Sequence, residues 1–293
     1  MFQTPDFLAD MLKREYGEEL FSRIEAGYRA KRVTSARVNR IKATADEVIA
    51  SLAAEGIEAK RADFYEDALI LSCDDRRAAG CAPFRDGRIY LQSLSSMLPV
   101  LYLGMLPGEN LLDMAAAPGG KTTQIAAMEP GCFVTACEKN PVRCERLKYN
   151  LALQGAHRVT VMEKDARKLD PLFVFDRILL DAPCSGSGTL SLDGTKAPDM
   201  TRELVGRSVG TQKQLLSCAL DRLRPGHELV YSTCSVLREE NEEVVRTVLK
   251  KAQIVPLTPP EGVTLLPAAI PGTLTVMPDE LFEGFFVCKL KKK

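Results

Sequence analysis

The spacing of apolar positions changes repeatedly along the chain, and from about residue 104 the changes become regular. Short apolar runs predict strands over 109–114, 132–138, 157–165, 175–183 and 227–235, with a last strand over 284–290. The segments between them have the longer spacing of helices, over 119–128, 141–155, 203–226 and 236–252. Strands that alternate with helices predict an α/β fold, in which a mainly parallel sheet carries helices on both faces.

The first 90 or so residues mix the two spacings differently. Amphipathic helices are predicted over 4–17 and 18–28, a strand over 35–43, and a helix over 44–56 that Gly56 ends. The stretch 74–90 is predicted to be a loop that runs into a strand. We therefore expect a small α+β domain over 1–92 and the α/β domain over 93–293.

Composition narrows the class of protein. The chain has 293 residues, 45% of them hydrophobic, and no net charge, so nucleic-acid binding would need a local basic patch. The N-terminus lacks the apolar core of a secretion signal, and no run is long enough to cross a membrane. Nine cysteines without a Cys-x-x-Cys pair, and only two histidines, favour reduced thiols and no metal site. We expect a cytoplasmic monomer without membrane contact.

Polar signals gather at the ends of the predicted strands, where sheets of this kind bind ligands. Residues 113–123, DMAAAPGGKTT, form a glycine-rich turn that opens a helix, an arrangement suited to anionic ligands. The turn nearly matches a phosphate-binding P-loop, but Ala115 stands where that motif needs glycine. A P-loop-like ATPase therefore stays open as an alternative.

Two acids follow the next two strands. Glu138 is suited to hydrogen-bonding ribose hydroxyls, and Asp165 to accepting from an adenine amino group. Acids after strands are often helix caps, so each is a weak signal alone. Together they predict an adenosine site, and S-adenosylmethionine (SAM) fits better than a dinucleotide because the turn lacks G-x-G-x-x-G spacing.

Two cysteines lie just past the ends of apolar strands. Cys184 follows Asp181 in LLDAPCSGSG, and Cys234 lies in YSTCS. A thiolate that adds to carbon 6 of cytosine makes carbon 5 nucleophilic enough to take a methyl group, and Asp181 is suited to hydrogen-bonding the base. The alternative is that both are buried structural cysteines.

These motifs resemble the Sun/nucleolar-protein family of SAM-dependent RNA cytosine-C5 methyltransferases, in its bacterial small-subunit ribosomal RNA type. The resemblance covers about residues 90–290 and rests on YLQSLSSML, DMAAAPGGKTT, EKNPVR, DAPCSGSG, YSTCS followed by EEN, and GFFVCKL. It implies a Rossmann-like methyltransferase. RVNRIKA resembles a strand of the family's N-terminal domain, which we expect to bind RNA.

The resemblance also implies roles for individual residues. Cys234 carries over as the nucleophile and Cys184 as the residue that helps release the product, while Lys121 and Asp181 carry over to the cytosine pocket. The cofactor-binding residues that it implies are Ala116, Ala117, Pro118, Gly119, Gly120, Lys121, Glu138, Arg143, Asp165 and Asp181. Ribosomal RNA is the first expected substrate and transfer RNA the second.

Other interpretations remain. DNA cytosine methyltransferases use the Pro-Cys thiol as nucleophile and need no Thr-Cys, so Cys234 favours RNA. Residues 23–42 hold seven basic residues against one acid and predict a phosphate-binding face, which would also suit a catalytically silent RNA-binding subunit. The chain ends at KLKKK after the last predicted strand, so we expect the C-terminal RNA-binding domain of many bacterial relatives to be absent.

Overall fold

The computed structural model describes residues 2–192 and 200–293. The chain divides into two compact units, one formed by Met1–Arg32 with Leu180–Lys293 and the other by Val33–Leu179. We call them the terminal unit and the central unit. The first 32 residues thus group with the C-terminal part of the chain, and the domain boundary at residue 92 stays a prediction.

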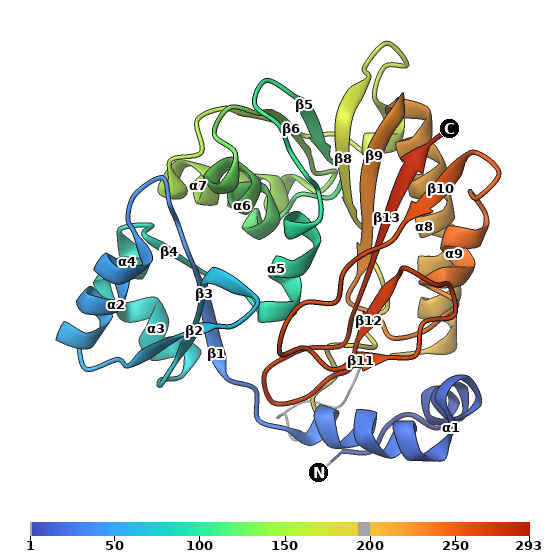
Figure 1. Ribbon diagram of the computed structural model, residues 1–293, viewed down its shortest axis with the longest axis horizontal. Helices are drawn as coiled ribbons and strands as arrows, with labels where there is room; N and C mark the ends of the chain where they lie inside the picture. The colour runs from blue at the N-terminus through green and yellow to red at the C-terminus, as the bar shows by residue number, and fades with distance from the viewer. Residues whose placement is uncertain (1, 193–199) are drawn as a thin grey trace. The chain divides into compact units, whose positions relative to one another are not determined.

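The central unit begins with a small antiparallel sheet in the order β2-β3-β1-β4 (Figure 1). Its strands are β1 (Thr34–Val38), β2 (Ala59–Ala62), β3 (Tyr65–Leu71) and β4 (Ile89–Leu91). Helix α2 (Ala45–Ala54) starts at a capping box in which Thr44 and Glu47 satisfy each other's backbone N–H groups. Apolar side chains of the strands and α2, among them Val38, Leu52 and Leu69, form a buried core.

The predicted loop over 74–90 is wrong in part, because it contains two short helices, α3 (Asp75–Gly80) and α4 (Ala82–Arg85). Asp74 caps α3 by accepting a hydrogen bond from the backbone N–H of Arg77 at 2.8 Å. Pro83 lies in the first turn of α4, where its missing N–H costs nothing. Asp74 and Pro83 are local signals for the start of a helix, but the polar composition of the stretch favours a loop and makes them hard to recognise in the sequence.

The rest of the central unit is the parallel sheet that the alternating pattern predicts. Strands β5 (Asn110–Asp113), β6 (Phe133–Cys137) and β7 (Val159–Met162) pair in parallel, and β8 (Phe175–Asp181) pairs in parallel with β5. Helices α5 (Leu94–Leu101), α6 (Gly120–Met128) and α7 (Pro141–Gln154) and the 3-10 turn η1 (Ala166–Lys168) alternate with these strands. The α/β class is confirmed.

The terminal unit contains α1 (Asp6–Arg29), α8 (Arg202–Arg222) and α9 (Glu242–Arg246). Strand β13 (Phe285–Lys292) pairs antiparallel with β9 (Leu223–Thr233), β12 (Leu274–Val276) and β10 (Ala252–Val255), and β11 (Leu265–Leu266) pairs with β12 (Figure 1). Helix α1 is kinked at Gly17, whose φ is 82°, and this agrees with the two helices predicted over 4–28.

The helix predicted over 236–252 is wrong in length. Only α9, five residues long, is α-helical there, and β10 begins at Ala252. The turns before α9 place Glu240 and Asn241 in the interior, both with no exposed surface. Their side chains bond to neighbouring loops instead of lying along a helix surface.

Candidate functional site

The two cysteines of interest come together in the terminal unit. Cys184 lies three residues after the end of β8 and Cys234 directly after β9, and their Sγ atoms are 2.8 Å apart. Both residues are half-buried and neither is in a disulfide. The expectation that two strand ends bring these thiols to one place agrees with this geometry.

Backbone pairing holds the two loops in register. The N–H of Ala182 donates to the carbonyl of Ser232 at 2.8 Å, and the N–H of Gly188 donates to the carbonyl of Cys234 at 3.0 Å. A Cβ at Gly188 would lie 1.9 Å from the carbonyl oxygen of Gly284, so this close approach requires glycine. The glycines of DAPCSGSG and GFFVCKL therefore let three backbone segments meet beside the thiols.

Asp181 ends β8 and accepts a hydrogen bond from the hydroxyl of Ser232 at 2.7 Å through its Oδ1 atom. This bond fixes the orientation of the carboxylate beside the two cysteine loops. A carboxylate fixed in this way is suited to recognising the hydrogen-bonding edge of a base.

The surroundings of Cys184 affect the ionisation of its thiol. The hydrogen-bonding contact with Cys234 raises the pKa of the Cys184 thiol, and burial and the Glu240 carboxylate act in the same direction. Cys184 is therefore protonated at neutral pH. A protonated thiol is a poor nucleophile, so this environment does not favour Cys184 as the residue that attacks carbon 6.

The candidate cofactor residues of the central unit surround the turn between β5 and α6. Gly119 has a φ of 112°, and a Cβ there would lie 3.0 Å from the side chain of Leu147. Asn150 donates to the carbonyl of Pro118 at 2.7 Å, and Arg143 donates to the carbonyl of Ala117 at 2.6 Å. Two residues of α7 thus hold the turn before the N-terminus of α6, a shape suited to an anionic or polar ligand.

Glu138 follows β6 and is 4% exposed. Its Oε1 accepts from the backbone N–H of Asn140 at 2.8 Å, and its Oε2 lies 3.5 Å from Nη1 of Arg143. Arg143 therefore links this carboxylate to the glycine-rich turn. A carboxylate oriented beside such a turn fits the ribose hydroxyls of an adenosine cofactor.

Asp165 and Lys121 have intramolecular partners in this structure. Asp165 caps η1 and forms an ion pair with Arg167, whose guanidinium holds the pKa of the Asp165 carboxyl below its usual range. Lys121 donates to the hydroxyl of Ser96 at 2.7 Å. Asp165 is thus a helix cap as well as a candidate adenine contact, and both residues' binding roles stay predictions.

The basic stretch over 23–42 is not one solvent-exposed face. Arg37 has no exposed surface and donates to Gln92 at 3.0 Å and to Thr123 at 2.8 Å, so it ties β1 to α6 inside the central unit. Burial lowers its pKa to about 10. Arg40 pairs with Asp67 at 2.6 Å, and Arg32 donates to the carbonyl of Phe282. Several of these charges therefore serve the fold.

Sequence reasoning missed Glu240 as a site residue. Its buried carboxylate binds the loops that carry both cysteines, yet it appeared only within the EEN motif. Among residues 2–192 and 200–293, no group of three or more His, Cys, Asp or Glu side chains is arranged to hold a metal ion. In the same ranges, no helix has the length and apolar character of a membrane span.

The fold and site define a methyltransferase class. Residues 100–291 match the family model described as 16S rRNA methyltransferase RsmB/F, and residues 4–74 match the ferredoxin-like domain of RsmF/B-like methyltransferases. The chain belongs to the RsmB/F family. Its predicted fold class is confirmed: a Rossmann-like SAM-dependent methyltransferase sheet with helices on both faces and a smaller α+β N-terminal domain. The P-loop ATPase is not favoured.

Individual relatives agree with this assignment. The chain is 36% identical over 283 residues to the ribosomal RNA small subunit methyltransferase F of Cronobacter sakazakii, covering 88% of this chain and 56% of the relative. It is 36% identical over 250 residues to the 26S rRNA (cytosine-C(5))-methyltransferase nsun-1 of Caenorhabditis elegans, covering 82% and 38%. The chain thus spans about half, or less, of these relatives' lengths.

A solved structure described as a methyltransferase homolog protein from Pyrococcus horikoshii is also similar. It is 31% identical, with a TM-score of 0.86, and the match covers 99% of this chain and 95% of that one. Family membership and this likeness agree with the predicted cofactor, S-adenosylmethionine.

Proposed function

We propose that this protein transfers a methyl group from S-adenosylmethionine to carbon 5 of a cytosine in RNA, with ribosomal RNA as the first candidate substrate and transfer RNA as the second. The observation that carries the proposal is the pair of thiols 2.8 Å apart after β8 and β9. A methyltransferase that acts on nitrogen or oxygen has no use for two paired thiols, whereas carbon 5 of cytosine needs a covalent partner at carbon 6.

The roles of the side chains follow from the chemistry. The Cys234 thiol loses its proton to solvent and adds through Sγ to carbon 6 of the cytosine, while N3 of the base takes up a proton. The carboxylate of Asp181, oriented by Ser232, then accepts hydrogen bonds from the protonated N3 and from the amino group. The resulting carbon 5 is enamine-like and nucleophilic. When bound, S-adenosylmethionine supplies the electrophilic methyl group that carbon 5 takes.

Release completes the reaction. The proton on carbon 5 must leave, and its bonding electrons then expel Sγ of Cys234. Cys184 gives up its own thiol proton to solvent beforehand, so that its thiolate can accept the proton from carbon 5. Cys184 acts in this step, directly or through water.

Residues of the central unit would hold the cofactor. The backbone of residues 116–120, with Lys121 beside it, would bind its methionine part, and the carboxylate of Glu138 would accept from its ribose hydroxyls. Arg143 bonds to both the turn and Glu138, and Asp165, whose carboxylate Arg167 orients, would accept from the adenine amino group.

The test separates the two cysteines. With labelled S-adenosylmethionine and total RNA, the wild-type protein should label RNA, and mapping of 5-methylcytosine identifies the RNA class. Cys234→Ala should abolish both turnover and covalent adducts. Cys184→Ala should stall as a protein–RNA adduct that survives denaturing electrophoresis and disappears with ribonuclease.

Cys73→Ala is the matched control, since this half-buried cysteine lies in the central unit, outside both candidate sites, and should leave methylation unchanged. Adducts trapped by Cys234→Ala and not by Cys184→Ala would reverse the assignment. Methylation retained in both variants would refute the covalent mechanism.

A further inference from the structure

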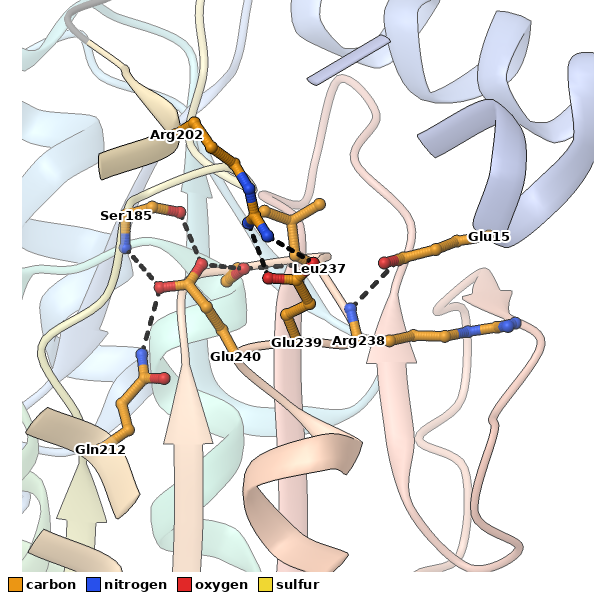
Figure 2. A network of polar contacts seen from close by, with 9 residues as sticks. Glu15, Ser185, Arg202, Gln212, Leu237, Arg238, Glu239 and Glu240 are labelled. Atoms are coloured by element: carbon orange, nitrogen blue, oxygen red, sulfur yellow. Dashed lines mark hydrogen bonds and ion pairs between the residues drawn. The ribbon is translucent and has the colours of Figure 1, made fainter. Parts of the chain in front are cut away.

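Glu240 lies in the turns between β9 and α9 and has no exposed surface. Its Oε1 accepts from the backbone N–H of Ser185 at 2.8 Å and from the amide of Gln212 at 3.1 Å. Its Oε2 accepts from the hydroxyls of Ser185 and Ser235, both at 2.6 Å. Figure 2 shows the carboxylate between Ser185 and Gln212. Four donors converge on one buried side chain.

The two serine partners of Glu240 each directly follow one of the two cysteines in the chain. Ser185 directly follows Cys184, and Ser235 directly follows Cys234. Gln212 also donates to the carbonyl of Pro183 at 3.0 Å, on the other side of Cys184. The same carboxylate therefore holds the backbone and hydroxyl of the residue after Cys184 and the hydroxyl of the residue after Cys234.

We propose that Glu240 is a positioning residue that sets the separation of the Cys184 and Cys234 thiols. Its importance for methyl transfer rests on the function proposed above, whereas its effect on the thiol separation does not. Glu240 touches neither substrate nor cofactor in this proposal and acts through the serines.

A carboxylate is specifically suited to this place. A carboxylate offers only acceptor oxygens, and the backbone N–H of Ser185 is always a donor, so this N–H needs an acceptor. In a glutamine, one carboxylate oxygen is replaced by an amide NH₂ group, which cannot accept from the two serine hydroxyls. An aspartate side chain is one methylene shorter and would not reach both loops. Charge-assisted bonds of this kind are short and strong, in keeping with the 2.6 Å contacts.

Glu240 is itself held on several sides. The hydroxyl of Tyr231 donates to its backbone carbonyl at 2.6 Å. Asn241, the next residue, accepts from the hydroxyl of Thr233 and donates to the carbonyl of Ser235 at 2.9 Å. Hydrogen bonds from Tyr231 and Thr233 of β9, and one that Asn241 donates to Ser235, fix the segment that carries the carboxylate.

The charge of Glu240 gives a second measurable effect. It is one of the groups that raise the pKa of Cys184, together with the contact with Cys234 and burial. Asp181 at the end of β8, Tyr231 on β9 and Cys288 on β13 are further titratable groups of this cluster. Removal of the Glu240 charge should shift the pH dependence of methylation to lower pH, and a purely structural role would not produce that shift.

Two substitutions separate spacing from charge. Glu240→Asp keeps the charge and loses the reach, while Glu240→Gln keeps the length and loses the charge. The matched control is Glu239→Gln, because the neighbouring Glu239 pairs with Arg202 at 2.6 Å and binds neither cysteine loop (Figure 2). Ser185→Ala and Ser235→Ala each remove one hydroxyl donor and replace the Glu240 variants if those fail to fold.

The first measurement needs no RNA. Diamide, a diazene, takes two electrons and two protons from the pair of thiols to give a Cys184–Cys234 disulfide and the hydrazine form of the reagent. Mass spectrometry of peptides quantifies the yield. Wild type and Glu239→Gln should form the disulfide readily, and Glu240→Asp should form it several times more slowly.

The second measurement is the single-turnover rate with transcribed small-subunit ribosomal RNA and labelled S-adenosylmethionine. Glu240→Asp should lose roughly ten- to a hundredfold in rate without a change in KM, since misplacement by about 1 Å costs that order. Glu240→Gln should also be slow, and its rate should rise with pH at a lower midpoint than that of wild type.

The outcomes are separable. Equal rates of disulfide formation in wild type and Glu240→Asp would overturn the positioning role, and so would a wild type that forms no disulfide. A wild type that forms the disulfide and methylates no RNA would refute the proposed function, while the diamide comparison would still decide on Glu240. Unchanged rates in both serine variants would also count against the inference.

Discussion

The substitution Glu15→Gln tests how helix α1 is joined to the rest of the terminal unit. Oε2 of Glu15 accepts a hydrogen bond from the backbone N–H of Arg238 at 3.1 Å (Figure 2). The next residue, Tyr16, donates through its hydroxyl to the carbonyl of Val236 at 2.7 Å. Burial raises the pKa of Glu15 to about 7, although the bond from Arg238 lowers it.

This pKa has a definite consequence for stability. A carboxyl whose pKa is raised on folding contributes stability that is fully present below its unfolded value of 4.5 and is lost as pH rises through about 7. The difference corresponds to about 3 kcal/mol at about 1.36 kcal/mol per pKa unit. Glutamine keeps the acceptor oxygen for Arg238 and avoids the buried charge.

Urea denaturation at about pH 5 and about pH 8 measures the effect. Glu15→Gln should differ little from wild type at the lower pH and should be more stable by up to about 3 kcal/mol at the higher pH. Glu19→Gln, on the exposed side of the same helix, should show no such dependence. An equal or lower stability of Glu15→Gln at the higher pH would refute the reasoning, because the loss of the favourable charge interaction with Arg238 would then outweigh the relief of burial.

Two further substitutions test the candidate sites. Glu138→Ala should raise the Kd for S-adenosylmethionine, measured by calorimetry, at least tenfold, since each charge-assisted hydrogen bond contributes about 1.5–3 kcal/mol. Glu145→Ala, at an exposed position on α7, is the control. An unchanged Kd in Glu138→Ala would mean that Glu138 has only a structural role. Gly188→Ala should lower Tm because its Cβ would lie 1.9 Å from the carbonyl oxygen of Gly284. Gly206→Ala is the control: the space around this glycine on α8 is open, and the substitution should raise stability by about 0.4–1 kcal/mol. A Gly188→Ala variant as stable as wild type would disprove the close approach of the two backbone segments.

The sequence predicted those parts of the fold whose signals are local. Alternating spacings predicted the parallel strands, Gly17 separated the two halves of α1, and the two Cys motifs were expected at strand ends. Features that depend on long-range packing were not predictable. The grouping of α1 with the C-terminal part, and the burial of Arg37 and Glu240, arise from contacts between residues far apart in the chain.

The segment 236–252 shows why a correct hydrophobic pattern can mislead. Its apolar spacing suits a helix, and α9 does form over Glu242–Arg246. The residues before α9 form turns instead of helix, and Glu240 lies in these turns. From this position its carboxylate accepts four hydrogen bonds from Ser185, Gln212 and Ser235.

The serine after each cysteine therefore has a physical explanation. Ser185 and Ser235 are small enough to lie beside a reactive thiol, and each presents a hydroxyl to the same acid. Alanine in either place would keep the packing but would leave part of the buried charge unpaired, at a cost of about 1–3 kcal/mol. The Pro-Cys-Ser and Thr-Cys-Ser motifs thus act as one unit with Glu240, because the thiol separation depends on both serines and on the acid that joins them.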